Sequence, residues 1–108
     1  MRRSVAALLP LLPIGGALAG GDVSPARATE LEHLLRHDCG SCHGMRLTGG
    51  LGPALTGAAL EEKSPISLQQ TILAGHPGTA MPPWAGILSA DDVRWLVEAL
   101  RAGKFDAP

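Results

Sequence analysis

The feature that most constrains this chain is a five-residue motif, Cys39-Gly40-Ser41-Cys42-His43. A C-x-x-C-H order suits covalent attachment of haem, because two thiols can form thioether bonds to the two vinyl groups of the porphyrin and the next imidazole can ligate the iron. The chain contains two cysteines, so this motif uses both of them. We therefore predict one covalently bound haem c, held by Cys39 and Cys42, with His43 as the proximal axial ligand.

Two other uses of a C-x-x-C pair fit the sequence less well. A thioredoxin-like redox pair follows a strand and opens a helix, but no βαβ pattern precedes Cys39. A zinc site needs four ligands, and the remaining histidines do not form a pair at zinc-finger spacing. These histidines are His33, His37 and His76. Haem attachment remains the favoured interpretation.

Residues 1–19 have the features of a secretory signal peptide. The basic pair Arg2-Arg3 is followed by an apolar stretch over residues 5–14, and residues 17–19 form an A-x-A cleavage pattern. A retained membrane anchor needs roughly 18 or more uninterrupted apolar residues, whereas prolines and glycines break this stretch. We expect cleavage after Ala19, a periplasmic location, and one mature domain over residues 20–108 without a stable membrane anchor.

The mature domain is expected to be mildly acidic. Loss of the signal peptide removes two of the nine basic side chains and none of the ten acidic ones, which leaves a formal charge of −3. This balance argues against a nucleic-acid partner, for which a basic stripe is expected. It favours a redox partner with a positively charged docking surface.

The mature sequence has little bulk for a hydrophobic core. Its aromatic residues are Trp84, Trp95 and Phe105, and a chain this short buries only about 60% of the surface that its unfolded form exposes. A covalently held porphyrin would supply the missing apolar volume.

Capping residues and apolar spacing predict three helices and a glycine-rich loop. Each helix has a serine at its start and apolar residues at helical spacing. The helices are expected from about Pro25 to Asp38, between Ser64 and Gly75, and between Ser89 and Gly103. Residues 44–57 are expected to form a loop around the porphyrin edge, because glycines and Pro53 disfavour regular structure there.

His33 and His37 lie four residues apart on the first predicted helix, a spacing that can hold a metal ion. Glu32, Arg36 and Asp38 surround them, so a solvated polar face is the favoured interpretation. His37 is also too close to Cys39 to reach the opposite face of the haem.

Met81 is the predicted second axial ligand, which would close the iron and specialise it for electron transfer. Met1 is lost with the signal peptide, and Met45 follows His43 too closely to cross the ring. The prolines that follow Met81 disfavour helix and stiffen its segment. His76, five residues upstream, is the alternative ligand and would give bis-histidine ligation.

The order of these elements over residues 20–108 resembles that of class I c-type cytochromes: helix, C-x-x-C-H, Gly-Pro loop, middle helix, Met-Pro and C-terminal helix. That resemblance implies an all-α fold of three to four helices around one haem, with His/Met ligation and one-electron transfer rather than enzymatic catalysis. It also implies that the Pro53 carbonyl accepts a hydrogen bond from His43. Trp84 is placed beside the haem, where it either bonds a propionate or covers the edge.

More narrowly, residues 39–55 and the Gly78–Trp84 segment resemble those of the small NirC-type cytochromes of denitrifying bacteria. This resemblance implies attachment by the cytochrome c maturation machinery and electron donation to cytochrome cd1 nitrite reductase. The alternative is an accessory redox role in haem d1 or nitrite reductase maturation.

Overall fold

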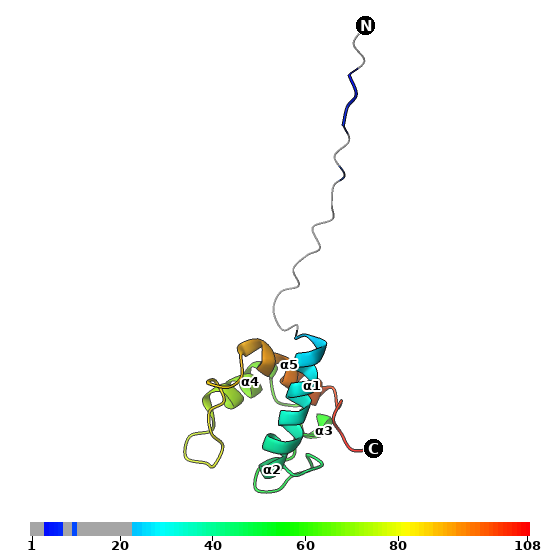
Figure 1. Ribbon diagram of the computed structural model, residues 1–108. Helices are drawn as coiled ribbons and strands as arrows, with labels where there is room; N and C mark the ends of the chain where they lie inside the picture. The colour runs from blue at the N-terminus through cyan, green and yellow to red at the C-terminus, as the bar shows by residue number, and fades with distance from the viewer. Residues whose placement is uncertain (1–3, 8–9, 11–22) are drawn as a thin grey trace.

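The computed structural model describes residues 4–7, 10 and 23–108 (Figure 1). Most of the predicted signal peptide lies outside the described residues, so its cleavage stays a prediction. Within the described part of the chain all regular structure is helical, which confirms the all-α fold. None of the helices in these residues is both long and apolar enough to cross a membrane.

The first helical run continues further than the sequence predicted. It comprises α1 (Pro25–Leu34), a π-helical turn η1 (Leu35–Cys39) and α2 (Gly40–His43). The prediction that the helix ends near Asp38 was therefore wrong. The run ends at Gly44, whose φ of +93° favours glycine. The wider η1 turn is closed by the Gly40 N–H donating to Leu35 O, five residues back.

The other two predicted helices are confirmed with their caps. α4 (Pro65–Ala74) begins after Ser64, whose hydroxyl accepts from the Ser67 N–H, and it ends at Gly75 with φ +72°. α5 (Ala90–Arg101) begins after Ser89, and Asp92 completes a reciprocal capping box.

A short helix that the sequence did not predict, α3 (Gly57–Leu60), follows the glycine-rich loop. The Thr56 hydroxyl caps it by accepting from the Ala59 N–H, and the Asp106 carboxylate accepts from the Gly57 N–H at 3.1 Å. The second contact crosses almost half of the chain. The helix was missed because it spans only four residues directly after a glycine-rich stretch, and the Asp106 contact has no local sequence signal.

The hydrophobic core lies where α5 crosses behind α1 in Figure 1, with α3 and α4 packed against α5. Phe105 adds aromatic bulk beyond the end of α5, because its buried ring lies 6.1 Å from that of Trp95. The most deeply buried side chains are mainly leucine and valine. They are Leu31, Leu35, Leu47, Val93, Leu96 and Val97.

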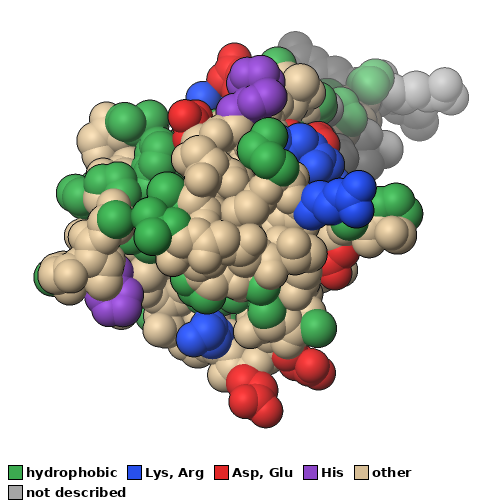
Figure 2. Space-filling view, turned by 90° about the horizontal axis from the view of Figure 1, so that it is seen from below, with side chains coloured by type: hydrophobic (Ala, Val, Ile, Leu, Met, Phe, Trp, Pro, Cys, Tyr) green, Lys and Arg blue, Asp and Glu red, His purple; other side chains and the backbone are tan. Residues whose placement is uncertain are grey.

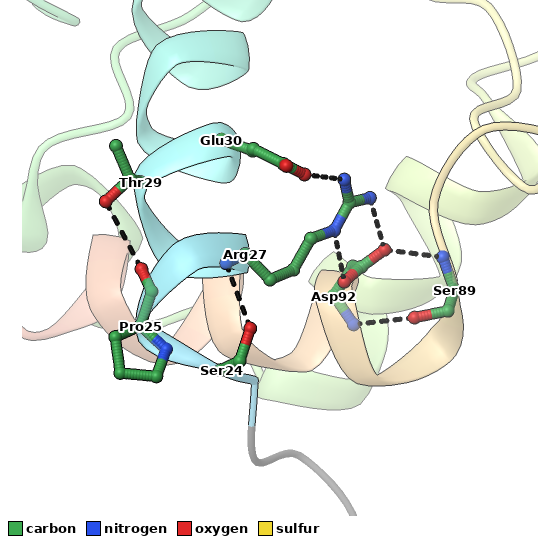
Figure 3. A network of polar contacts seen from close by, with 7 residues as sticks. All are labelled: Ser24, Pro25, Arg27, Thr29, Glu30, Ser89 and Asp92. Carbon is green, nitrogen blue, oxygen red and sulfur yellow. Dashed lines mark hydrogen bonds and ion pairs between the residues drawn. The ribbon is translucent and has the colours of Figure 1, made fainter.

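One ion pair ties the start of α1 to the start of α5 (Figure 3). Arg27 donates from Nε and Nη2 to the two carboxylate oxygens of Asp92, at 3.1 and 2.8 Å. Asp92 is only 6% exposed and also accepts from the Ser89 N–H at 3.0 Å. These contacts, the Arg27 guanidinium above all, lower the pKa of Asp92 to about 2.

We predict that Arg27→Met will lower the free energy of unfolding of the haem-loaded protein by about 1–3 kcal/mol, because it leaves the Asp92 carboxylate nearly buried without its cation. Urea denaturation at pH 7 measures this loss. Glu30→Gln is the matched control, since the exposed Glu30 contacts the same guanidinium at 2.7 Å and exposed pairs contribute at most about 1 kcal/mol.

The same variant should show a defined pH dependence. The pKa of Asp92 is lowered in the folded state from an ordinary 3.8 to about 2, so its stabilisation is complete above the ordinary value and is lost as pH falls through about 2. The difference between the unmutated protein and Arg27→Met should therefore shrink between pH 4 and 2. An equal loss for Glu30→Gln, or a difference that is constant with pH, would contradict this assignment.

Candidate haem site

The C-x-x-C-H side chains lie together at the end of the first helical run. Cys39 ends the π-helical turn, and Cys42 and His43 are the last residues of α2. Positions three residues apart are neighbours on a helix surface, so the two thiols lie close together. Both are free and half-buried, and His43 is half-buried beside them. One helix end therefore presents two thiols and one imidazole.

The electrostatics of Cys39 do not suit a catalytic redox pair. Burial above all, and then the adjacent Asp38 carboxylate, raise the pKa of its thiol to about 11. The reactive thiol of a thioredoxin-like pair has a lowered pKa instead. The zinc alternative also gains no support, because no group of three or more His, Cys, Asp or Glu side chains in the described residues is arranged to hold a metal.

A short hydrogen bond fixes the imidazole of His43, with Nδ1 2.6 Å from the carbonyl oxygen of Pro53. A carbonyl oxygen can only accept, so Nδ1 carries the proton and Nε2 keeps its lone pair. A neutral imidazole whose other nitrogen donates to a fixed acceptor is the usual form of a metal-ligating histidine. The contact between Pro53 and His43 is thus present, and its role beside a haem stays a prediction.

The loop after α2 folds back to bring Pro53 to this position. Its backbone returns to the helix end through the Gly49 N–H, which donates to His43 O, and the Gly52 N–H, which donates to Cys42 O, both at 2.8 Å. Leu47 anchors the loop in the core and is only 1% exposed, at a φ of +59°.

Gly52 lies close to the His43 ring. A Cβ atom at this position would lie 2.8 Å from both Cε1 and Nδ1 of the imidazole, closer than such atoms normally approach. The loop therefore forms a cradle around the imidazole, and a side chain at position 52 would occupy the space that the ring needs. The sequence predicted a glycine-rich loop here, but it did not show which glycine contacts His43.

Met81 lies in a segment that is fastened to the end of α4. The Trp84 N–H donates to Ile72 O at 3.0 Å, and the Ala85 N–H donates to Leu73 O at 3.2 Å. Gly75 packs against the same segment, since a Cβ there would lie 2.8 Å from the Pro82 carbonyl carbon. Met81 is half-buried, and Figure 1 places its segment and α2 at the same end of the molecule.

His76 belongs to the turn that leads into the Met81 segment. Its N–H donates to Met81 O at 3.2 Å, and its carbonyl accepts from the Thr79 hydroxyl at 2.6 Å. The side chain of His76 is exposed, whereas that of Met81 is half-buried. The backbone thus holds both candidate ligands on one turn, and the burial difference favours Met81.

Apolar side chains remain partly exposed on α4 and on the loops beside it. α4 has no fully buried residue, although its apolar side chains pack against the core. Five of the partly buried apolar side chains come from α4 and from the loops on either side of it. They are Leu55, Leu68, Ile72, Leu73 and Trp84. Together with two thiols, one imidazole and one thioether, this surface has the chemistry that a covalently attached haem requires.

Comparisons with known proteins identify the family of the chain. Residues 26–98 match the family described as cytochrome C oxidase, cbb3-type, subunit III. A cytochrome c55X of Pseudomonas aeruginosa is 56% identical over 93 residues, which cover 86% of this chain and 77% of that protein. A solved structure of a c-type cytochrome NirC is 58% identical with a TM-score of 0.77, covering 79% of this chain and all of that one.

A third relative is much larger. A dihydro-haem d1 dehydrogenase of Pseudomonas aeruginosa is 38% identical over 93 residues, which cover 86% of this chain but only 17% of the dehydrogenase. A domain similar to this chain is therefore one part of that protein.

We predict that Gly52→Ala will lower the yield of protein with covalent haem and destabilise what is formed by about 1–3 kcal/mol, because the added methyl group overlaps the His43 ring. Haem stain after denaturing electrophoresis measures the yield, and thermal unfolding measures the stability. Gly86→Ala is the matched control, since a Cβ there meets nothing within 4 Å. Equal behaviour of the two variants would show that the cradle around His43 does not matter.

Proposed function

Because this chain belongs to the class I c-type cytochromes of the NirC and cytochrome c55X type, we propose that it is a periplasmic carrier of single electrons to cytochrome cd1 nitrite reductase. Proteins of this family carry covalently bound haem c, and this chain has one attachment motif. When bound, the haem supplies reversible one-electron chemistry at its iron. The residues of the chain hold it, orient it and limit access to it.

The main support for the role as an electron carrier is that backbone hydrogen bonds hold both segments that contain the proposed axial ligands. The Pro53 carbonyl holds the proton on His43 Nδ1 and leaves Nε2 for the iron. Hydrogen bonds to α4 hold the Met81 segment. Cys39 and Cys42 would hold the porphyrin by thioether bonds. An iron with two such side-chain ligands is suited to electron transfer rather than to binding a substrate.

The surface supports a brief encounter with a redox partner. Figure 2 shows a face with a largely uncharged centre and charged side chains at its edges. The loop after α2 adds two exposed apolar side chains, Met45 and Leu51. Contacts of electron-transfer proteins usually bury less than about 1,200 Å² in total, which permits rapid release.

A second candidate function rests on the third relative. A domain similar to this chain occurs within a protein named for the oxidation of a dihydro-haem d1. In that alternative the chain would accept electrons from a reaction that matures the d1 cofactor, and it would not donate them to the finished reductase.

Stopped-flow mixing of the reduced cytochrome with oxidised cytochrome cd1 distinguishes these functions. We predict transfer at least about tenfold faster than to an unrelated haem protein, with a rate that falls as ionic strength rises, because the acidic carrier is steered towards a basic entry site. A rate no faster than that of the unrelated acceptor would contradict the donor role. Faster reduction of this chain by a dihydro-haem d1 dehydrogenase would then favour the maturation role.

A further inference from the structure

Two histidine side chains lie in contact on the exposed surface of the helical run that leads into the C-x-x-C-H motif. His33 is in the last turn of α1 and His37 is in the π-helical turn that follows. Their ring centroids are 4.2 Å apart with the planes tilted by 44°, and both residues are exposed. Figure 2 shows histidine side chains gathered at one edge, beside acidic and basic groups.

The charged side chains near this pair form ion pairs with one another. Glu32 pairs with Arg36 at 3.2 Å, and Glu30 pairs with Arg27 at 2.7 Å. Across residues 23–108 neither imidazole takes part in a hydrogen bond or an ion pair with these groups. Asp38 follows His37 directly, and adjacent helical positions do not face each other. The ring nitrogens of both histidines are therefore available to coordinate a metal ion.

Two imidazoles four residues apart on one helical face are a bidentate ligand for transition metals. This spacing is the one that holds zinc in H-E-x-x-H helices, and imidazole also suits copper and nickel. Because no third His, Cys, Asp or Glu joins the pair among the described residues, water would complete the coordination. The resulting site would be open and exchangeable.

We propose that His33 and His37 bind one divalent transition metal ion on the surface of the first helical run. The proposal does not depend on the identity of the electron partner or on the axial ligands of the haem. Such an ion would add two positive charges to a mature domain of formal charge −3 and would change its electrostatics at one edge. The Irving–Williams order predicts that Cu²⁺ binds more tightly than Zn²⁺.

Calorimetric titration of untagged, haem-loaded, chelator-treated protein with Zn²⁺ tests the site. One ion per chain is expected, and His33→Asn and His37→Asn should each weaken binding at least about tenfold, since loss of even a second-shell partner costs about 10–100-fold. Zn²⁺ should also raise the Tm of the unmutated protein more than that of either variant. Both variants should fold, because the side chains are exposed.

His76→Asn is the matched control, because His76 is exposed but lies outside the pair. It should bind Zn²⁺ as the unmutated protein does. A similar loss in His76→Asn, or retained affinity in both His33→Asn and His37→Asn, would overturn the proposal. Repeating the titration with Cu²⁺ should give tighter binding through the same two residues, and copper binding that survives loss of both would count equally against it.

Discussion

The hydrogen bond between His43 Nδ1 and the Pro53 carbonyl is the contact on which the rest of the site depends. It determines which imidazole nitrogen carries a proton, and hence which can face an iron. The backbone serves this contact: the helix stops at Gly44, the loop returns to the helix end, and Gly52 leaves room for the ring. A 2.6 Å contact between residues ten positions apart thus explains why a glycine-rich loop follows the motif.

The two halves of the site are held by different parts of the fold. The half with the C-x-x-C-H motif is fixed through α1, which the Arg27 to Asp92 pair joins to α5. The Met81 half is fixed through α4, whose last carbonyls accept from the Trp84 and Ala85 N–H groups. α4 packs on α5 as well, so α5 is the common support of both halves. A covalently attached porphyrin would join them a second time.

Local signals in the sequence predicted α4 and α5 well, because a capping serine and a terminating glycine act within a few residues. They failed where distant residues decide the structure. The first helical run ends only at His43, because Gly44 and the returning loop set its end. The first N–H of α3 donates to Asp106, which lies at the other end of the chain. The motif indicated a haem site directly, since its chemistry lies within five residues, whereas the contact of Gly52 with His43 needed the folded loop.

We infer that His43 and Met81 would together close the iron, and carbon monoxide binding to the ferrous protein tests this ligation most directly. The unmutated protein should resist carbon monoxide, because side chains would occupy both axial positions of the bound haem. Met81→Ala should bind it readily, while His76→Ala and Met45→Ala should behave like the unmutated protein. Ready binding by His76→Ala, with Met81→Ala still resistant, would contradict the account and assign the second ligand to His76.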